Sequence, residues 1–312
     1  MVRCGLLRAL FFAAATIALA FLALPLVAIF VRVAPGRLIH QLSNPVVIDA
    51  LVVSLKTTLI AQVLILILGT PLAYLLASRR FRGRSVLVTL IELPLVLPPA
   101  VAGLGLLAAF GRVGLLGSTL DGLGLSIPFT QTAVTLAVAY VASPLYIRTA
   151  IAAFEAVDPD VVAASRTLGA GSTRTFFRVV LPLARSGLAA GEALAFARGL
   201  GEFGATIMFA GSLQGVTQTL PLAIYSAFDV DFDVALAMGA LLVVISAALL
   251  LSLRLILSWQ PSRQTSRSLF APLSEGWRST SSARSPSSGP PALARARSSA
   301  SSPVSPGPTR GT

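Results

Sequence analysis

The chain has 312 residues, of which 55% are hydrophobic and only 12% are charged. A soluble domain of this size needs more charge to cover its surface, so the composition indicates an integral membrane protein. The lone Cys4 and the lone His40 exclude a disulfide framework and a cysteine- or histidine-based metal site. The net charge of +12 is spread over short loops and a Ser/Pro-rich tail, which argues against a nucleic-acid-binding groove.

Six apolar segments are long enough to cross a membrane, for which about 20 residues are needed. The first follows Arg3 and Arg8, and its length favours a retained anchor helix over a cleaved signal peptide. Arginines cluster after the second and fourth segments, whereas residues 211–233 contain none, so both termini are expected in the cytoplasm. The fold class predicted is therefore an all-α integral membrane protein whose helices occupy 9–32, 50–77, 86–110, 129–150, 186–210 and 234–257.

Prolines interrupt the third segment, which contains Pro94, Pro98 and Pro99 and is followed by Gly103 and Gly105. Proline removes a backbone donor and kinks a helix, and a membrane tolerates this only where other groups satisfy the freed carbonyls. The pattern fits a broken helix that lines a transport path. It fits equally an ordinary proline kink at a helix end.

The longest loop expected in the cytoplasm, residues 156–183, has the pattern of two short helices. Residues 158–160 (Asp-Pro-Asp) supply an N-cap, a first-turn proline and an acidic residue, and Gly169 is placed to end the first helix. A second helix is expected to begin at Ser172 or Thr173 and to end at Pro182. The loop is either a knob for a partner's groove or a surface helix on the inner leaflet.

The fifth segment carries charges that are costly in hydrocarbon. Arg198 and Glu202 are four residues apart and can pair on one helix face, either to line or gate a pore or to tie helices together. Gly187 and Gly191 form a candidate helix-contact face. Lys56, in the second segment, is explained by snorkelling to head groups or by attraction of an incoming anion.

Three aspartates alternate with apolar residues in the last outer loop, at 229, 231 and 233. Their spacing does not suit a calcium loop. We expect Asp233 to cap the sixth helix, with docking of a binding protein as the alternative.

The predicted cytoplasmic loop, residues 156–183, resembles the Glu-Ala-Ala loop of ABC-importer permeases. That family has Glu-Ala-Ala, three residues, Gly, nine residues and Ile-x-Leu-Pro, and this spacing is matched throughout. Ala163 stands in place of the glutamate, Ser165 in place of the second alanine, and Val179 in place of the isoleucine. The residues that the resemblance assigns to ATPase coupling are Ala163, Ala164, Ser165, Arg166, Gly169, Leu181 and Pro182.

Three further stretches, 94–99, 201–208 and 219–225, resemble the molybdate permease branch, and the resemblance covers about 49–252. It implies a type I transmembrane domain in a homodimer, two cytoplasmic ATPases that bind ATP-Mg, an extracytoplasmic oxyanion-binding protein, and no cofactor on this chain. The domains expected are an anchor helix and outer loop (1–48), the transmembrane domain (49–258) and a disordered tail (259–312). Candidate pore or gate residues are Pro98, Pro99, Arg198, Glu202 and Thr206.

Other functions remain open at this point. Sulfate or tungstate could replace molybdate, because we expect the binding protein to select the oxyanion. An ion-coupled secondary transporter would have internal repeats and unpaired midplane carboxylates, and the sequence offers no clear repeat. An intramembrane enzyme is disfavoured because no H-E-x-x-H or G-x-S-x-G motif occurs, and no P-loop is present for ATP.

Overall fold

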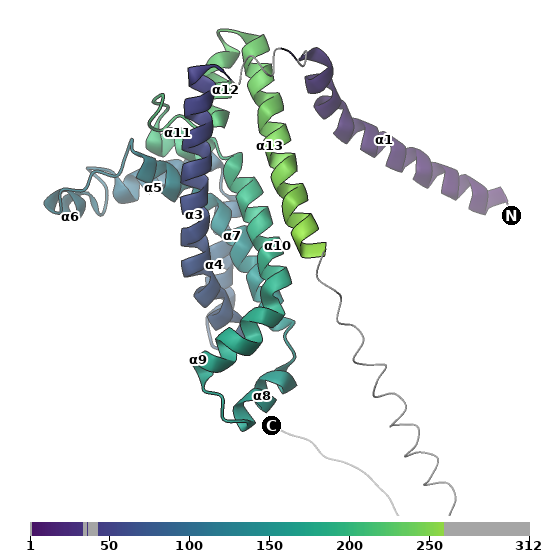
Figure 1. Cartoon of the computed structure of the whole chain (residues 1–312), viewed down its shortest axis with the longest axis vertical. Helices are drawn as coiled ribbons and strands as arrows, with labels where there is room; N and C mark the ends of the chain where they lie inside the picture. Colours follow the sequence, from purple (N-terminus) through teal and green to yellow (C-terminus); the bar gives the residue numbers. More distant parts are fainter. Residues whose placement is uncertain (1, 34–35, 37–42, 259–312) are drawn as a thin grey trace, which may run out of the picture. The chain divides into compact units, whose positions relative to one another are not determined.

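A computed structural model describes residues 2–33, 36 and 43–258 of the chain. Every regular element in these residues is a helix. Figure 1 shows their arrangement. In chain order the helices are α1 (Val2–Arg32), α3 (Pro45–Ser78), α4 (Arg84–Val96), α5 (Pro99–Phe110), α6 (Gly117–Gly122), α7 (Gln131–Glu155), α8 (Pro159–Thr167), α9 (Ser172–Thr175), the π-helix η1 (Phe176–Val180), α10 (Leu181–Leu200), α11 (Gly204–Ala210), α12 (Leu220–Phe228) and α13 (Phe232–Ser258).

Five continuous helical stretches are long and apolar enough to span a membrane, and α4 with α5 would make a sixth span that is bent by 114°. The all-α fold class with about six crossings is therefore confirmed. The third crossing is a broken helix, since Leu97 and Pro98 both have extended ψ angles between the two halves. The inside location of both termini stays a prediction, and the tail 259–312 lies outside the described residues, as does His40.

The core lies where α3, α7 and α10 pack against one another. Small residues allow this approach: a Cβ added at Gly187 would lie 2.5 Å from the Ala153 Cβ, and one at Gly191 would lie 3.0 Å from the Thr149 Cβ. Gly187 and Gly191 do form a contact face, and their partner is α7 of the same chain. Tyr146 is fully buried between these helices, and its hydroxyl lies 2.6 Å from the Thr70 hydroxyl.

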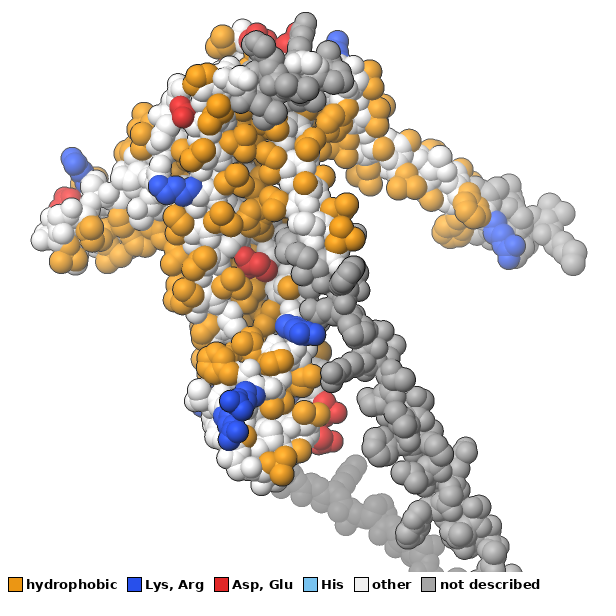
Figure 2. All heavy atoms as spheres, in the orientation of Figure 1, with side chains coloured by type: hydrophobic (Ala, Val, Ile, Leu, Met, Phe, Trp, Pro, Cys, Tyr) orange, Lys and Arg blue, Asp and Glu red, His pale blue; other side chains and the backbone are white. Residues whose placement is uncertain are grey.

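Large hydrophobic side chains are exposed along the spanning helices, for example Leu68 on α3 at 69% and Leu251 on α13 at 62%. Figure 2 shows hydrophobic atoms over much of the visible face of these helices. A soluble protein does not expose apolar surface on this scale, whereas lipid covers it without cost.

Besides shifts of a few residues at helix ends, two features of the spanning helices differ from the sequence prediction. The fifth segment was expected to be one helix over 186–210, but α10 ends at Leu200 and α11 starts at Gly204. The last helix is capped by Asp231, whose Oδ1 accepts hydrogen bonds from the backbone N–H groups of Asp233 and Val234, at 3.0 and 3.2 Å. The prediction that Asp233 is the cap was therefore wrong by two residues, because Asp233 lies in the first turn.

Candidate functional site

The loop 156–183 contains helix α8, and both ends of this helix are closed as predicted. The Asp158 carboxylate accepts a hydrogen bond from the Asp160 N–H at 2.9 Å, and Pro159 occupies the first turn. At the other end Gly169 has φ +82°, a conformation that favours glycine. The Gly169 N–H donates to the Arg166 carbonyl and the Ala170 N–H to the Ser165 carbonyl, which together make a Schellman motif. The backbone shape of α8 is therefore fixed locally.

The second half of the loop differs from the prediction. The helix α9 starts after Gly171, with no side-chain cap from Ser172 or Thr173, and it continues through η1 into α10. Pro182 does not end this helix, because it lies in the first turn of α10, where a missing N–H is tolerated. The result is one helical stretch, Ser172–Leu200, that joins the loop to the membrane.

An aromatic cluster connects this stretch to the bundle. The Phe176 ring in η1 lies 4.6 Å from the Tyr74 ring of α3 and 6.2 Å from the Phe154 ring of α7, and Tyr74 and Phe154 are 5.4 Å apart. The Ser165 and Thr175 hydroxyls, 3.1 Å apart, also hold α8 to α9. A displacement of α8 would therefore be passed to α3, α7 and α10 through packed contacts.

The loop presents a small-residue and apolar surface. Ala163, Ala164 and Arg166 are exposed, and Leu168 is 89% exposed. Of the other predicted coupling residues, Ser165 and Leu181 are partly buried and Pro182 is exposed. Sequence analysis did not single out Leu168. The sequence feature that could have identified Leu168 is an apolar side chain directly before the glycine that ends α8.

The third and fifth spanning segments are both broken, into α4 and α5 and into α10 and α11, and α5 packs against α11. A Cβ added at Gly204 would lie 2.6 Å from the Pro99 Cβ, and one at Gly103 would lie 2.6 Å from the Ala205 carbonyl oxygen. Close contact between α5 and α11 therefore requires both glycines. Pro98 and Pro99, two of the candidate pore or gate residues, are exposed at the break between α4 and α5.

Arg198 and Glu202 form the predicted ion pair, with the Arg198 Nη1 2.8 Å from the Glu202 Oε2. Glu202 lies in the break between α10 and α11, and its second oxygen accepts a hydrogen bond from the Ala205 N–H at 2.8 Å. The Glu202 side chain is 1% exposed and the Arg198 side chain 34%. Thr206, the remaining candidate, is fully buried, and its hydroxyl has no hydrogen-bond partner among the described residues. In this conformation Glu202 both caps α11 and holds Arg198.

A polar face of α3 was missed by sequence analysis. Ser54, Thr58 and Gln62 are spaced four residues apart in an apolar helix, which places them on one face, and all three are buried. The Ser54 hydroxyl accepts a hydrogen bond from the Leu220 N–H at 2.7 Å. Neither polar atom of the Gln62 carboxamide has a partner within the described part of the chain, and Gly199 of α10 lies directly beside it. The signal that could have found this face was the four-residue spacing.

Lys56 is exposed on α3, and its Nζ donates a hydrogen bond to the Gln131 side-chain oxygen at 2.9 Å. Across residues 2–33, 36 and 43–258, no group of three or more His, Cys, Asp or Glu side chains is placed to hold a metal ion.

Comparison with known sequences gives consistent matches. Residues 69–265 match the family described as the binding-protein-dependent transport system inner membrane component. The chain is 46% identical to the molybdenum transport system permease protein ModB of Mycobacterium tuberculosis, over 74% of this chain and 88% of that protein. It is 41% identical to ModB of Escherichia coli K12, over 68% of this chain and 92% of that protein.

Solved structures share the fold at lower identity. A bacterial ABC transporter involved in the import of the acidic polysaccharide alginate matches with a TM-score of 0.63 and 17% identity, covering 83% of this chain and 97% of the other. The MetNI methionine ABC transporter in an inward-facing conformation matches with a TM-score of 0.55 and 20% identity, covering 69% and 98%. These likenesses establish the architecture alone.

Proposed function

This chain belongs to the binding-protein-dependent transport system inner membrane component family and is an ABC-importer permease of the molybdate branch, and from that premise we propose that it forms the membrane path for molybdate. It is a multi-pass inner-membrane transport subunit, and the ATP-hydrolysing subunit is a separate chain. We infer that two copies form the path, with two cytoplasmic ATPases that bind ATP-Mg. An extracytoplasmic binding protein delivers the oxyanion.

The observation that carries the proposed coupling to an ATPase is the construction of the loop 156–183. A docking element must keep its shape when a partner pushes on it, and α8 is closed at both ends by its own hydrogen bonds. It must also offer apolar surface to the partner, which Leu168 and the exposed alanines do. Finally it must pass force to the membrane, and the continuous stretch Ser172–Leu200 provides that connection.

Transport then follows from conformational change. Closure of the ATPases on ATP would move α8, and the aromatic cluster of Tyr74, Phe154 and Phe176 would carry that motion to the spanning helices. The energy enters through different contacts in the two states, so no catalytic residue is required on this chain. The breaks at α4/α5 and α10/α11 are where the bundle can change shape, because their backbone hydrogen-bond ladders are already interrupted.

We assign the transmembrane domain to residues 49–258, preceded by an anchor region (1–48) and followed by a tail (259–312). Molybdate is preferred as the substrate because relatives that are 46% and 41% identical to this chain are named for molybdenum transport. The pore residues do not have to recognise it closely, since a binding protein can select the oxyanion before it reaches the membrane.

The test is uptake into proteoliposomes that contain this chain, its ATPase and its binding protein. Molybdate should accumulate only when ATP is inside, and excess sulfate outside should compete poorly. Accumulation that follows an ion gradient and ignores ATP would identify a secondary transporter and contradict the proposal. ATP-dependent uptake of sulfate in preference to molybdate would contradict the substrate assignment alone.

A further inference from the structure

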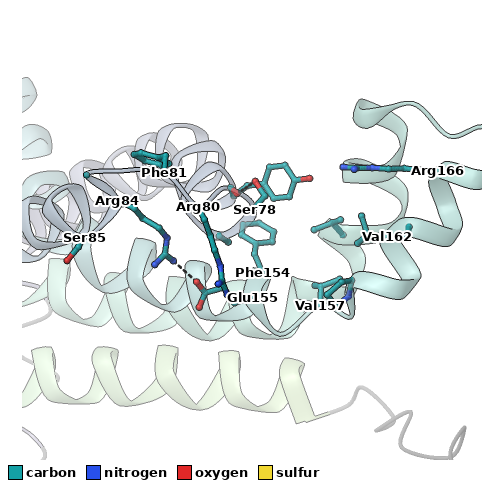
Figure 3. Close-up of a pocket in the computed structure, with 16 residues that line it drawn as sticks. Ser78, Arg80, Phe81, Arg84, Ser85, Phe154, Glu155, Val157, Val162 and Arg166 are labelled. Carbon is teal, nitrogen blue, oxygen red and sulfur yellow. Dashed lines mark hydrogen bonds and ion pairs between the residues drawn. The ribbon is translucent and has the colours of Figure 1, made fainter. Parts of the chain in front are cut away.

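A cavity of about 1030 Å³ lies between the cytoplasmic loop and the adjacent ends of α3, α4 and α7. Figure 3 shows that side chains from the α3–α4 connection and from α8 point into it from opposite sides. Its lining combines apolar residues such as Tyr74, Phe154 and Val180 with polar and basic residues. Ala163 and Arg166, two of the residues assigned to ATPase coupling, also line it, so the cavity borders the docking surface proposed for α8.

The cavity has more positive than negative charge. Arg80, Arg84 and Arg166 line it, together with Glu155 as the single carboxylate. Arg84 is already engaged, because its Nη2 pairs with the Glu155 Oε1 at 2.5 Å and its Nε donates to the Leu76 carbonyl at 2.7 Å. Within the described part of the chain, Arg80 and Arg166 have no ion pair or hydrogen bond from their guanidinium groups. Two full positive charges therefore face the same cavity without a counter-charge.

Residue 163 also lines this cavity, and here it is alanine. A carboxylate at this position would neutralise one arginine from within the chain. Because Ala163 cannot do so, both exposed guanidinium groups are left available to an anion from outside the chain. The Ser85 hydroxyl adds a hydrogen-bond donor to the lining, whereas the Ser78 hydroxyl already donates to the Tyr74 carbonyl at 2.6 Å. Guanidinium and hydroxyl donors together suit the oxygens of a phosphate.

The surroundings favour a lipid phosphate over a soluble one. Leu75 and Val86 are chain neighbours of the lining residues Tyr74 and Ser85, and they are 44% and 62% exposed. Acyl chains could cover such side chains while the head group enters the basic cavity. Basic cavities at the cytoplasmic ends of spanning helices bind anionic head groups in this way.

We propose that this cavity binds the phosphate of an anionic phospholipid of the cytoplasmic leaflet. The side of the membrane rests on the function proposed above. The bound phosphate bridges Arg80, from the α3–α4 connection, and Arg166, from α8. It thereby stabilises the position of α8 against the bundle, and the lipid composition would tune the coupling between the ATPase and transport.

The experiment measures binding of phosphatidylglycerol and of phosphatidylcholine to the purified full-length chain in detergent. One variant combines Arg80→Ala and Arg166→Ala. A second, Ala163→Glu, keeps both arginines and supplies an internal carboxylate. The matched control combines Arg82→Ala and Arg174→Ala, which removes the same charge from exposed positions in the α3–α4 connection and in α9, outside the cavity. Thermal unfolding of each variant verifies that it is folded.

Phosphatidylglycerol binding should weaken at least about tenfold more in the double variant than in the control, because charge-assisted hydrogen bonds are lost. Ala163→Glu should weaken it in the same direction, and phosphatidylcholine binding should not change in any variant. Equal losses in the double variant and the control would overturn the proposal. Displacement of the lipid by inorganic phosphate would show that the cavity takes a soluble anion instead, which also overturns it.

A further arm adds the ATPase. The proposal expects phosphatidylglycerol to remain bound to the assembled complex, and its release on assembly would show that ATPase side chains occupy the cavity. The lipid measurements use the permease itself and require no uptake. Failure of the lipid proposal would therefore be seen separately from failure of the transport function.

Discussion

Removal of the Glu202 carboxylate should destabilise the protein through two lost contacts. Both oxygens are bonded at 2.8 Å, one to Arg198 and one to the Ala205 N–H that starts α11. In Glu202→Ala the guanidinium keeps its charge in the membrane-spanning part without this partner. Breaking one side of a buried ion pair costs about 3–5 kcal/mol, and loss of a helix cap costs about 1 kcal/mol.

The exposed fractions of the two side chains predict the order in which the variants are destabilised. Arg198 is 34% exposed at its side chain and can recover some solvation, whereas Glu202 is 1% exposed. Arg198→Ala, which leaves the more buried charge alone, should therefore destabilise the protein at least as much as Glu202→Ala. The double variant should be more stable than the sum of the two single effects allows, since it leaves neither charge unpaired. Glu202→Gln keeps an acceptor for the Ala205 N–H and should cost least.

The assay is thermal unfolding of the detergent-purified variants, with molybdate uptake measured on the same preparations. If the Arg198–Glu202 pair only stabilises the fold, uptake should fall in proportion to the loss of folded protein. Additive effects in the double variant would refute the coupling argued from the geometry. A variant with unchanged unfolding and abolished uptake would instead show that the pair acts in gating.

Three further changes test the loop and the broken helices. Gly169→Val places a β-branched residue at φ +82°, which costs about 1–3 kcal/mol locally. Co-purification of the ATPase with this variant should therefore fall. The control Gly171→Ala, at φ −65°, should leave co-purification unchanged. Equal co-purification of both variants would refute the shape requirement. Gly204→Val would bring side-chain atoms against Pro99 and should lower the melting temperature, because overpacking reduces the free energy of unfolding by about 1–3 kcal/mol. An unchanged melting temperature would mean that α5 and α11 are not tightly packed. Ser165→Ala loses one hydrogen bond to α9, worth about 1 kcal/mol, and should weaken ATPase co-purification less than Gly169→Val does.

Much of the fold could be predicted from the sequence because hydrophobic length and helix-end signals are local properties. The apolar segments and the N-cap at Asp158 needed no knowledge of distant residues. Gly169 as the end of α8 and the pairing of Arg198 with Glu202 also follow from short spacings. In each case the structure has the predicted contact.

What the sequence missed depends on tertiary packing. The stretch 186–210 is long enough to read as one spanning helix, and the contact beside its break at residues 201–203 joins Gly204 to Pro99, a residue about a hundred positions away. Pro182 was expected to end a helix, and only the π-helix before it shows that α10 begins there. The cavity beside α8 combines residues of α3, α4, α7, α8 and η1, so no local pattern marks it.

The central claim, that α8 docks the ATPase, is tested most directly by site-specific cross-linking. In a Cys4→Ser background, a photo-cross-linker is attached at Leu168→Cys, where the native side chain is 89% exposed. The matched position is Asp121→Cys in α6, also exposed, outside the cytoplasmic loop. The account predicts cross-links to the ATPase from position 168 and none from position 121. No ATPase cross-link from position 168 in an assembled, transport-active complex would contradict it.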